Sequence, residues 1–206
     1  MDHEIFKPFG PSIVKIKIPQ NIIQEMNTFV DEIIHDKEKL ERLNEGPKLA
    51  GNVSQEFLMT TMFMKKIKWA EYLASNCGEW VWKEKNVKLT KFQIIKSWIV
   101  RQFKNEYNPI HYHTGDISGV GYLKLPSNMG ETLQKDKKIN HNGKLILIDG
   151  SKKLFCSPTY AITPQVGDFY LFPSYLMHTV YPFSNTDEER RSVSFNAKID
   201  EVSSML

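Results

Sequence analysis

Three of the six histidines in this chain fall in two short segments that both have the pattern of a β-strand edge. His111 and His113 are two residues apart, and His178 lies in a distant segment. Side chains at i and i+2 of an extended segment point to the same face, about 7 Å apart, so two such imidazoles can bind one ion. A third ligand from another strand would complete a facial site with open positions for a substrate and O2. The pattern therefore indicates non-haem iron chemistry.

The third ligand has two candidates. Asp116 could provide the carboxylate of a site made of two histidines and one carboxylate. Its spacing of three residues from His113 breaks strand alternation, which favours His113 as the ligand. In the Asp116 case, His113 would lie beside the ligands or face the substrate. The sequence therefore favours His111, His113 and His178 and leaves Asp116 as the alternative.

An anion-binding group follows His178 on the last long strand-like segment. Arg190 and Ser192 alternate on one face of that segment, while Val193 faces the other way. The planar fork of arginine suits a two-point grip on a carboxylate, and a nearby hydroxyl adds a donor. Tyr122, on the strand after the histidine pair, could add a phenolic donor. These residues predict a carboxylate site near the metal.

Short apolar runs separated by Gly, Pro, Asn and Asp dominate the chain after residue 86. Such spacing is typical of a β-sandwich or barrel rather than of alternating strands and helices. The runs are Phe92–Phe103, Ile117–Leu125, Lys144–Ile148, Tyr160–Thr163, Asp168–Phe172, His178–Tyr181 and Arg190–Asp200.

The region before residue 89 has a different pattern. Residues 12–18 alternate like a half-buried strand, and apolar residues after Pro19 repeat at helical spacing. We expect one helix from about residue 21 into the forties and a second between Lys65 and Lys85. The fold class predicted is mainly β with N-terminal helices (α+β), and its core is a double-stranded β-helix (jelly-roll, cupin-like). The expected organisation is a single domain over residues 1–206, with the strand and two supporting helices in residues 1–88 and the metal-carrying barrel in residues 89–206.

Composition restricts the class of protein. A hydrophobic share of 41% and a charged share of 25% are those of an ordinary soluble globular protein. The net charge of +3 comes with no block of like charges, so no nucleic-acid partner is predicted. No apolar run approaches a membrane span, and Cys77 and Cys156 lack metal-type spacing, so a cytoplasmic protein is expected.

The motifs together resemble the iron(II)- and 2-oxoglutarate-dependent oxygenases. The first half is His111-Tyr112-His113 followed by Ser118-Gly119-Val120-Gly121-Tyr122, and the second is Phe172-Pro173-Ser174, His178 and the strand Arg190 to Asn196. The likeness is closest to bacterial and phage members with a His-x-His pair, a Ser-Gly-Val-x-Tyr strand and an Arg-x-Ser strand. It covers about Trp98 to Asn196.

The resemblance implies a set of roles. His111 and His178 would bind Fe(II), and His113 would stand where the superfamily usually has Asp or Glu. Arg190 would bind the distal carboxylate of 2-oxoglutarate, helped by Ser192 and Tyr122. The implied activity is a dioxygenase that uses Fe(II), 2-oxoglutarate and O2 to hydroxylate a small-molecule or peptidyl substrate, releasing succinate and CO2.

Two other functions fit part of the pattern. Three neutral histidines are also the ligand set of a catalytic zinc site, so a cupin-like Zn or Mn hydrolase or isomerase is one alternative. A non-catalytic jelly-roll binding module is the other. A carboxylate clamp at Arg190 and Ser192 argues against the hydrolase. The segments Ser127 to Gly143 and Gly46 to Gln55 are expected to select the substrate, because loops at a barrel mouth usually have that role.

Overall fold

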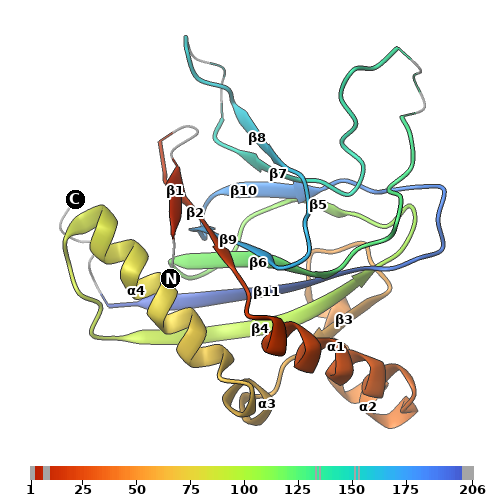
Figure 1. Cartoon of the computed structure of the whole chain (residues 1–206), viewed down its shortest axis with the longest axis horizontal. Coiled ribbons are helices and arrows are strands. Elements are labelled where there is room, and N and C mark those ends of the chain that lie inside the picture. The colour runs from red at the N-terminus through yellow and green to blue at the C-terminus, as the bar shows by residue number, and fades with distance from the viewer. Residues whose placement is uncertain are drawn as a thin grey trace.

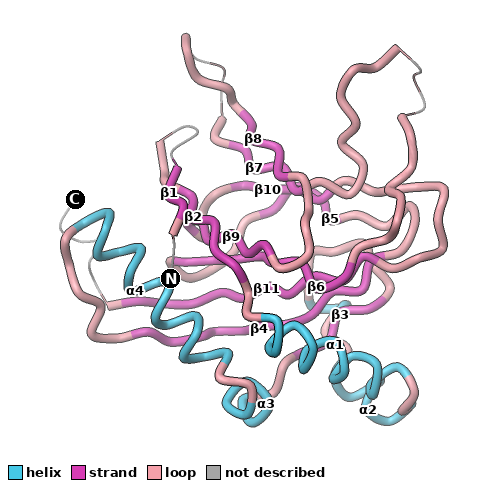
Figure 2. The backbone as a smooth tube through the Cα atoms, in the orientation of Figure 1, coloured by secondary structure: helices cyan, strands magenta, loops and turns pink. Residues whose placement is uncertain are grey.

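Two antiparallel β-sheets face each other in the computed structural model, and helices cover the outer face of the larger sheet (Figures 1 and 2). The structure describes residues 3–6, 10–132, 134, 136–150, 152 and 154–200. The sheet orders are β1-β2-β9-β6-β11-β4-β3 and β5-β10-β7-β8. Mainly antiparallel strands in two facing sheets confirm the predicted jelly-roll core with N-terminal helices.

The strands of the larger sheet are β1 (Glu4–Phe6), β2 (Ile13–Lys17), β3 (Gln55–Leu58), β4 (Phe92–Gln102), β6 (Ile117–Lys124), β9 (Asp168–Pro173) and β11 (Arg190–Ile199). Those of the smaller sheet are β5 (Asn108–His111), β7 (Leu145–Ile148), β8 (Thr159–Ile162) and β10 (Met177–Val180). The helices are α1 (Gln20–Ile34), α2 (Lys37–Leu43), α3 (Thr61–Lys66) and α4 (Trp69–Lys85), with a 3₁₀ turn η1 at Gly46–Lys48.

Strand alternation divides the interior into two apolar layers. On β11, Val193 and Phe195 are fully buried and pack with the helices, in the layer between the larger sheet and α1 and α4. Arg190 and Ser192 point to the opposite face and line a cavity between the sheets. The predicted division of this strand into two faces is confirmed. The site residues therefore lie inside the barrel, and the helices support the sheet from outside.

The N-terminal region contains more elements than the sequence pattern predicted. The prediction of one long first helix is wrong. Helix α1 ends at Ile34, and Asp36 starts the separate helix α2 by accepting a hydrogen bond from the Lys39 amide. The second helix, expected between Lys65 and Lys85, is confirmed as α4. The short helix α3 precedes it and was not expected, and Lys68 separates the two in a left-handed conformation with φ of 56°. Strands β1 and β3 were not expected. The single-domain organisation stays a prediction.

Close packing between β6 and β9 makes one glycine indispensable for stability. A Cβ atom on Gly121 would overlap the ring of Phe169 and lie 2.8 Å from Ile18 Cδ1. We expect Gly121→Ala to destabilise the protein by about 1–3 kcal/mol, because a packed core resists added volume. A Cβ atom on Gly78 of α4 would meet nothing within 4 Å, so Gly78→Ala should stabilise the protein by about 0.5–1 kcal/mol. Urea unfolding midpoints measure both effects, and shifts of the same sign would contradict this packing argument.

Candidate active site

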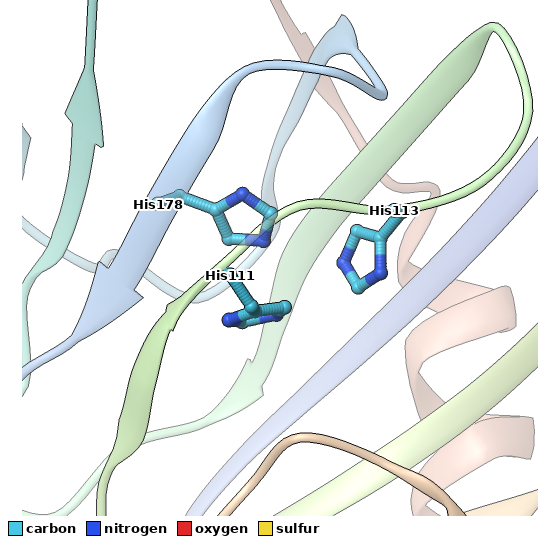
Figure 3. A group of neighbouring side chains, drawn as sticks. All are labelled: His111, His113 and His178. Atoms are coloured by element: carbon cyan, nitrogen blue, oxygen red, sulfur yellow. The ribbon is translucent and has the colours of Figure 1, made fainter. Parts of the chain in front are cut away.

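Three histidines meet between the two sheets (Figure 3). His111 ends β5 and pairs in register with His178 of β10, while His113 lies two residues past the end of β5. The ring centroids are 4.3 Å apart for His111 and His178, and His113 is 4.9 Å from each. Their ligand nitrogens all lie within 4.8 Å of one another. The structure therefore brings together the three histidines that the sequence favoured.

Backbone carbonyls orient two of these rings. Nδ1 of His111 lies 2.7 Å from the carbonyl oxygen of Pro109, and Nδ1 of His178 lies 2.9 Å from that of Leu176. A carbonyl oxygen can only accept, so each Nδ1 carries the hydrogen, and each Nε2 keeps a free lone pair. This arrangement is typical of metal-binding histidines, whose second nitrogen donates to an orienting group.

The environment keeps these imidazoles neutral. Burial, together with the neighbouring His178 and His111, lowers the pKa of His113 to about 3. Burial, and then His111, lowers the pKa of His178 to about 4. Burial also lowers the pKa of His111. Neutral imidazoles are the form that binds a metal, so the site is ready for a cation at neutral pH.

The low pKa of His178 predicts how the metal-free protein responds to acid. Burial lowers this pKa from 6.5 to about 4, whereas the unfolded chain titrates near the ordinary value. Between these values the unfolded state binds more protons, so stability falls as the pH falls, by at most about 1.4 kcal/mol per pH unit from this group. We expect His178→Gln to make the dependence of the free energy of unfolding on pH shallower. Urea titrations across this range measure the two slopes, and equal slopes would contradict the prediction.

Asp116 lies outside the histidine group. Its Oδ2 accepts a hydrogen bond from the backbone N–H of Ile199 at 2.9 Å, and its own N–H donates to the carbonyl of Ala197 at 2.8 Å. Among the described residues, the groups that could hold a metal include His113 and not this carboxylate. The geometry therefore favours His113 over Asp116 as the third ligand.

Arg190 is a buried cation with unused donors. Its side chain is 1% exposed, and Nη1 donates to Gln102 Oε1 at 3.1 Å and to Ser192 Oγ at 3.2 Å. Within the described part of the chain, its Nε and Nη2 have no hydrogen-bond partner, and neither does the buried hydroxyl of Tyr122. The guanidinium lies over the Tyr122 ring, 5.1 Å from the centroid. A buried cation that keeps unused donors and has no anionic partner is unfavourable, so these donors fit an incoming anion.

The adjacent Arg191 differs from Arg190 because carboxylates and a backbone carbonyl of this chain accept its hydrogen bonds. It is also 1% exposed, but it points to the helix side of the sheet. Its Nη2 donates to Asp31 at 2.8 Å and to Glu189 at 2.6 Å, and its Nη1 donates to the Asn27 carbonyl at 3.0 Å. The charge of Arg191 is thus compensated within the chain, whereas Arg190 has only neutral partners among the described residues.

One cavity joins the histidines to Arg190. Apolar and polar residues line it in similar numbers, and Ser192 and Ser194 add hydroxyl groups to the polar set. The lining residues are Trp98, Val100, Asn108, His111, His113, Gly119, Val120, Leu145, Phe172, His178, Val180, Arg190, Ser192 and Ser194. Apolar walls with convergent polar groups are the kind of lining that binds small molecules.

The sequence reasoning missed Gln102, a direct neighbour of Arg190. Gln102 holds the guanidinium, and it shares the inward face of β4 with Trp98 and Val100, so strand alternation could have identified it. Trp98 packs edge-on against His113 with centroids 5.8 Å apart. Arg101 and Lys124, which flank the site in sequence, pair with Glu189.

The segment that carries this site is similar to a known protein family. A family model described as "Putative 2OG-Fe(II) oxygenase" matches residues 96–196, which include all three histidines and Arg190. No curated protein sequence matches the chain.

Solved structures show the fold. A viral collagen prolyl hydroxylase from Paramecium bursaria Chlorella virus-1, in complex with 2-oxoglutarate, is 15% identical with a TM-score of 0.54, covering 90% of this chain and 94% of its own. A prolyl-4-hydroxylase from Pseudomonas putida is 13% identical with a TM-score of 0.57, covering 89% and 91%. HygX from Streptomyces hygroscopicus, with nickel, 2-oxoglutarate and hygromycin B bound, is 11% identical with a TM-score of 0.57, covering 90% and 82%.

Fold and site define an oxidoreductase of the double-stranded β-helix class. More particularly, residues 96–196 match the model of a family of 2OG-Fe(II) oxygenases, in agreement with the sequence motifs. Fe(II) is the cofactor of this superfamily, and 2-oxoglutarate and O2 are its co-substrates. No helix among the described residues is both long and apolar enough to cross a membrane.

Proposed function

We propose that this enzyme is a hydroxylase in which His111, His113 and His178 bind Fe(II) and Arg190 binds 2-oxoglutarate. The bound metal and co-substrate would supply the oxidising chemistry, in which 2-oxoglutarate is converted to succinate and CO2 while the substrate gains an oxygen atom. The protein residues would hold these groups and keep them apart from water.

The donor set supports an iron site. Three neutral imidazoles bind divalent iron through nitrogen and leave the remaining coordination positions open. The backbone carbonyls of Pro109 and Leu176 accept from Nδ1 of His111 and His178, which leaves Nε2 of each ring free to bind a metal. A set with no carboxylate leaves the full charge of the metal uncompensated, so an anionic co-substrate would be drawn to it.

The uncompensated charge of Arg190 is the observation that carries the proposal. This guanidinium is 1% exposed and lines the same cavity as the three histidines. A dicarboxylate that extends from the metal would place its distal carboxylate against the free Nε and Nη2, with the Tyr122 hydroxyl as a further donor. Ser192 would fix the guanidinium from the other side through its bond to Nη1. A hydrolase would have no use for this buried clamp.

The apolar walls would position the substrate and exclude water. Val100, Phe172 and Val180 line the same cavity as the three histidines and Arg190. A dry environment strengthens the hydrogen bonds and ion pairs formed within it. The similar structures include prolyl hydroxylases and a protein with hygromycin B bound, so the substrate proposed is a peptide or a small molecule. The segments Ser127 to Gly143 and Gly46 to Gln55 stay our prediction for the parts that select it.

Turnover of 2-oxoglutarate tests the proposal. We expect the Fe(II)-loaded parent to form succinate from 2-oxoglutarate in air, slowly without substrate and faster when a peptide or small molecule fits. His178→Ala should form none, because it removes a ligand held in the centre of β10. Succinate formation that is equal in the parent and in His178→Ala would contradict the assignment of the site.

A further inference from the structure

We propose that Ser174, Ser118, Asn196 and Asp116 form a clamp that positions His113, and we call this group the turn clamp. The inference rests on the proposed function, because it explains how the third metal ligand is held. His111 and His178 are fixed by pairing between β5 and β10. His113 lies beyond the end of β5, on a turn of four residues, 113–116, that precedes β6. A ligand on a turn needs another means of support.

The backbone of Ser174 forms hydrogen bonds with both ends of this turn. Its carbonyl accepts a hydrogen bond from the N–H of His113 at 2.9 Å, and its own N–H donates to the carbonyl of Asp116 at 3.0 Å. The same residue therefore fixes the backbone directly at the ligand and at the last residue of the turn. Ser174 follows β9 and precedes β10, so it is also close in sequence to His178.

A buried side-chain network fixes Ser174 to the larger sheet. Its Oγ lies 2.8 Å from Ser118 Oγ, and Ser118 donates to Asn196 Oδ1 at 2.8 Å. Ser118 has a single hydroxyl hydrogen, which the amide oxygen takes, so Ser174 donates to Ser118. The three side chains are 0%, 1% and 8% exposed for Ser174, Ser118 and Asn196. Ser118 and Asn196 are register partners on β6 and β11, two central strands of the sheet.

The end of β11 holds the other side of the turn. Asp116 donates its N–H to the Ala197 carbonyl at 2.8 Å, and its carboxylate accepts from the Ile199 N–H at 2.9 Å. Gly115, the preceding residue, has φ of +107°, and a Cβ there would lie 2.7 Å from the same Ala197 carbonyl. Only glycine fits this approach. Asp116 is therefore a positioning residue, and its carboxylate is engaged by the backbone of β11.

The turn clamp connects the turn that carries His113 to β6 and β11, and thereby fixes the position of the third imidazole. Metal ligands must be held closely to their productive geometry, and loss of an outer partner typically weakens metal binding by about 10- to 100-fold. We therefore expect the clamp to act on metal affinity and geometry, beyond any effect on folding.

Ser118→Ala and Ser97→Ala form a matched pair that separates these effects. Both serines are 1% exposed and hydrogen-bonded in the larger sheet, and Ser97 bonds to the Ser194 carbonyl and to Trp69, away from the turn. Co(II) serves as the probe, because its visible absorption reports coordination geometry. We expect Ser118→Ala to bind Co(II) at least about tenfold more weakly and with an altered spectrum, while Ser97→Ala keeps the parent affinity and spectrum. Unfolding midpoints should fall in both variants.

The outcomes distinguish the clamp from the proposed function. Parent-like Co(II) affinity and spectrum in Ser118→Ala, or equal losses in both variants, would overturn the clamp and leave the metal site in place. A parent that binds no Co(II) would overturn the proposed function and the clamp's role with it. Amide hydrogen exchange of the metal-free protein gives a second measurement: exchange at His113 should accelerate in Ser118→Ala and not in Ser97→Ala, and unchanged exchange in Ser118→Ala would also overturn the clamp.

Discussion

Replacing Arg190 with methionine is expected to weaken 2-oxoglutarate binding strongly and to leave the protein folded. Loss of one partner of a buried charged pair costs about 2–5 kcal/mol of binding energy, which is roughly 30-fold or more in Kd. The fold should tolerate the change, because this guanidinium is 1% exposed with only neutral partners among the described residues. Removal of an uncompensated buried charge by an apolar side chain is often neutral or stabilising. Calorimetric titration of 2-oxoglutarate into Mn(II)-loaded protein measures the loss.

Arg191→Met is the matched control, with the opposite expected result. Arg191 is the next residue and equally buried, but its charge is compensated by the carboxylates of Glu189 and Asp31. Its loss leaves those carboxylates with fewer partners and should lower stability by up to about 3 kcal/mol. The folded fraction should still bind 2-oxoglutarate with the parent affinity. Parent-like binding by Arg190→Met, or a loss of binding in Arg191→Met alone, would show that the co-substrate site has been misassigned.

His113→Ala is the second change with a large expected effect. It removes one of three nitrogens that lie within 4.8 Å of one another, and no other described residue is placed to replace it. We expect metal affinity to fall by more than about 100-fold, beyond the loss caused by an outer partner. His113→Asp should retain binding better than His113→Ala, because it creates a site of two histidines and one carboxylate. Equilibrium titration with Co(II) compares the three proteins.

Asp116→Ala decides between the two third-ligand candidates. If Asp116 acts through its bond to the Ile199 N–H, its removal should weaken Co(II) binding by about tenfold. The loss should therefore be much smaller than that in His113→Ala. A larger loss in Asp116→Ala than in His113→Ala would make the carboxylate the ligand and His113 its neighbour.

Local sequence patterns predicted the parts of this site that depend on strand alternation. His111 and His178 face one another, and Arg190 and Arg191 point to opposite sides of β11, because side chains alternate along a strand. The antiparallel barrel followed from the short apolar runs and their turn residues. These features depend on residues close together in the chain, so the sequence alone was sufficient to predict them.

Contacts between distant segments decided the rest. The role of Asp116 depends on Ile199, and the support of His113 depends on Ser174, which no local period reveals. The helix break at Asp36 came from a side-chain cap that overrode the apolar period. The difference between the two arginines also required the structure, since Asp31 reaches Arg191 from α1.

Anaerobic addition of 2-oxoglutarate to the Fe(II)-loaded protein tests the central claim most directly. A 2-oxo acid chelated to Fe(II) gives a visible charge-transfer absorption that neither component gives alone. We predict that this absorption appears in the parent at one equivalent of 2-oxoglutarate and is lost in His178→Ala. A parent that binds Fe(II) and gives no such absorption at saturating 2-oxoglutarate would contradict the account.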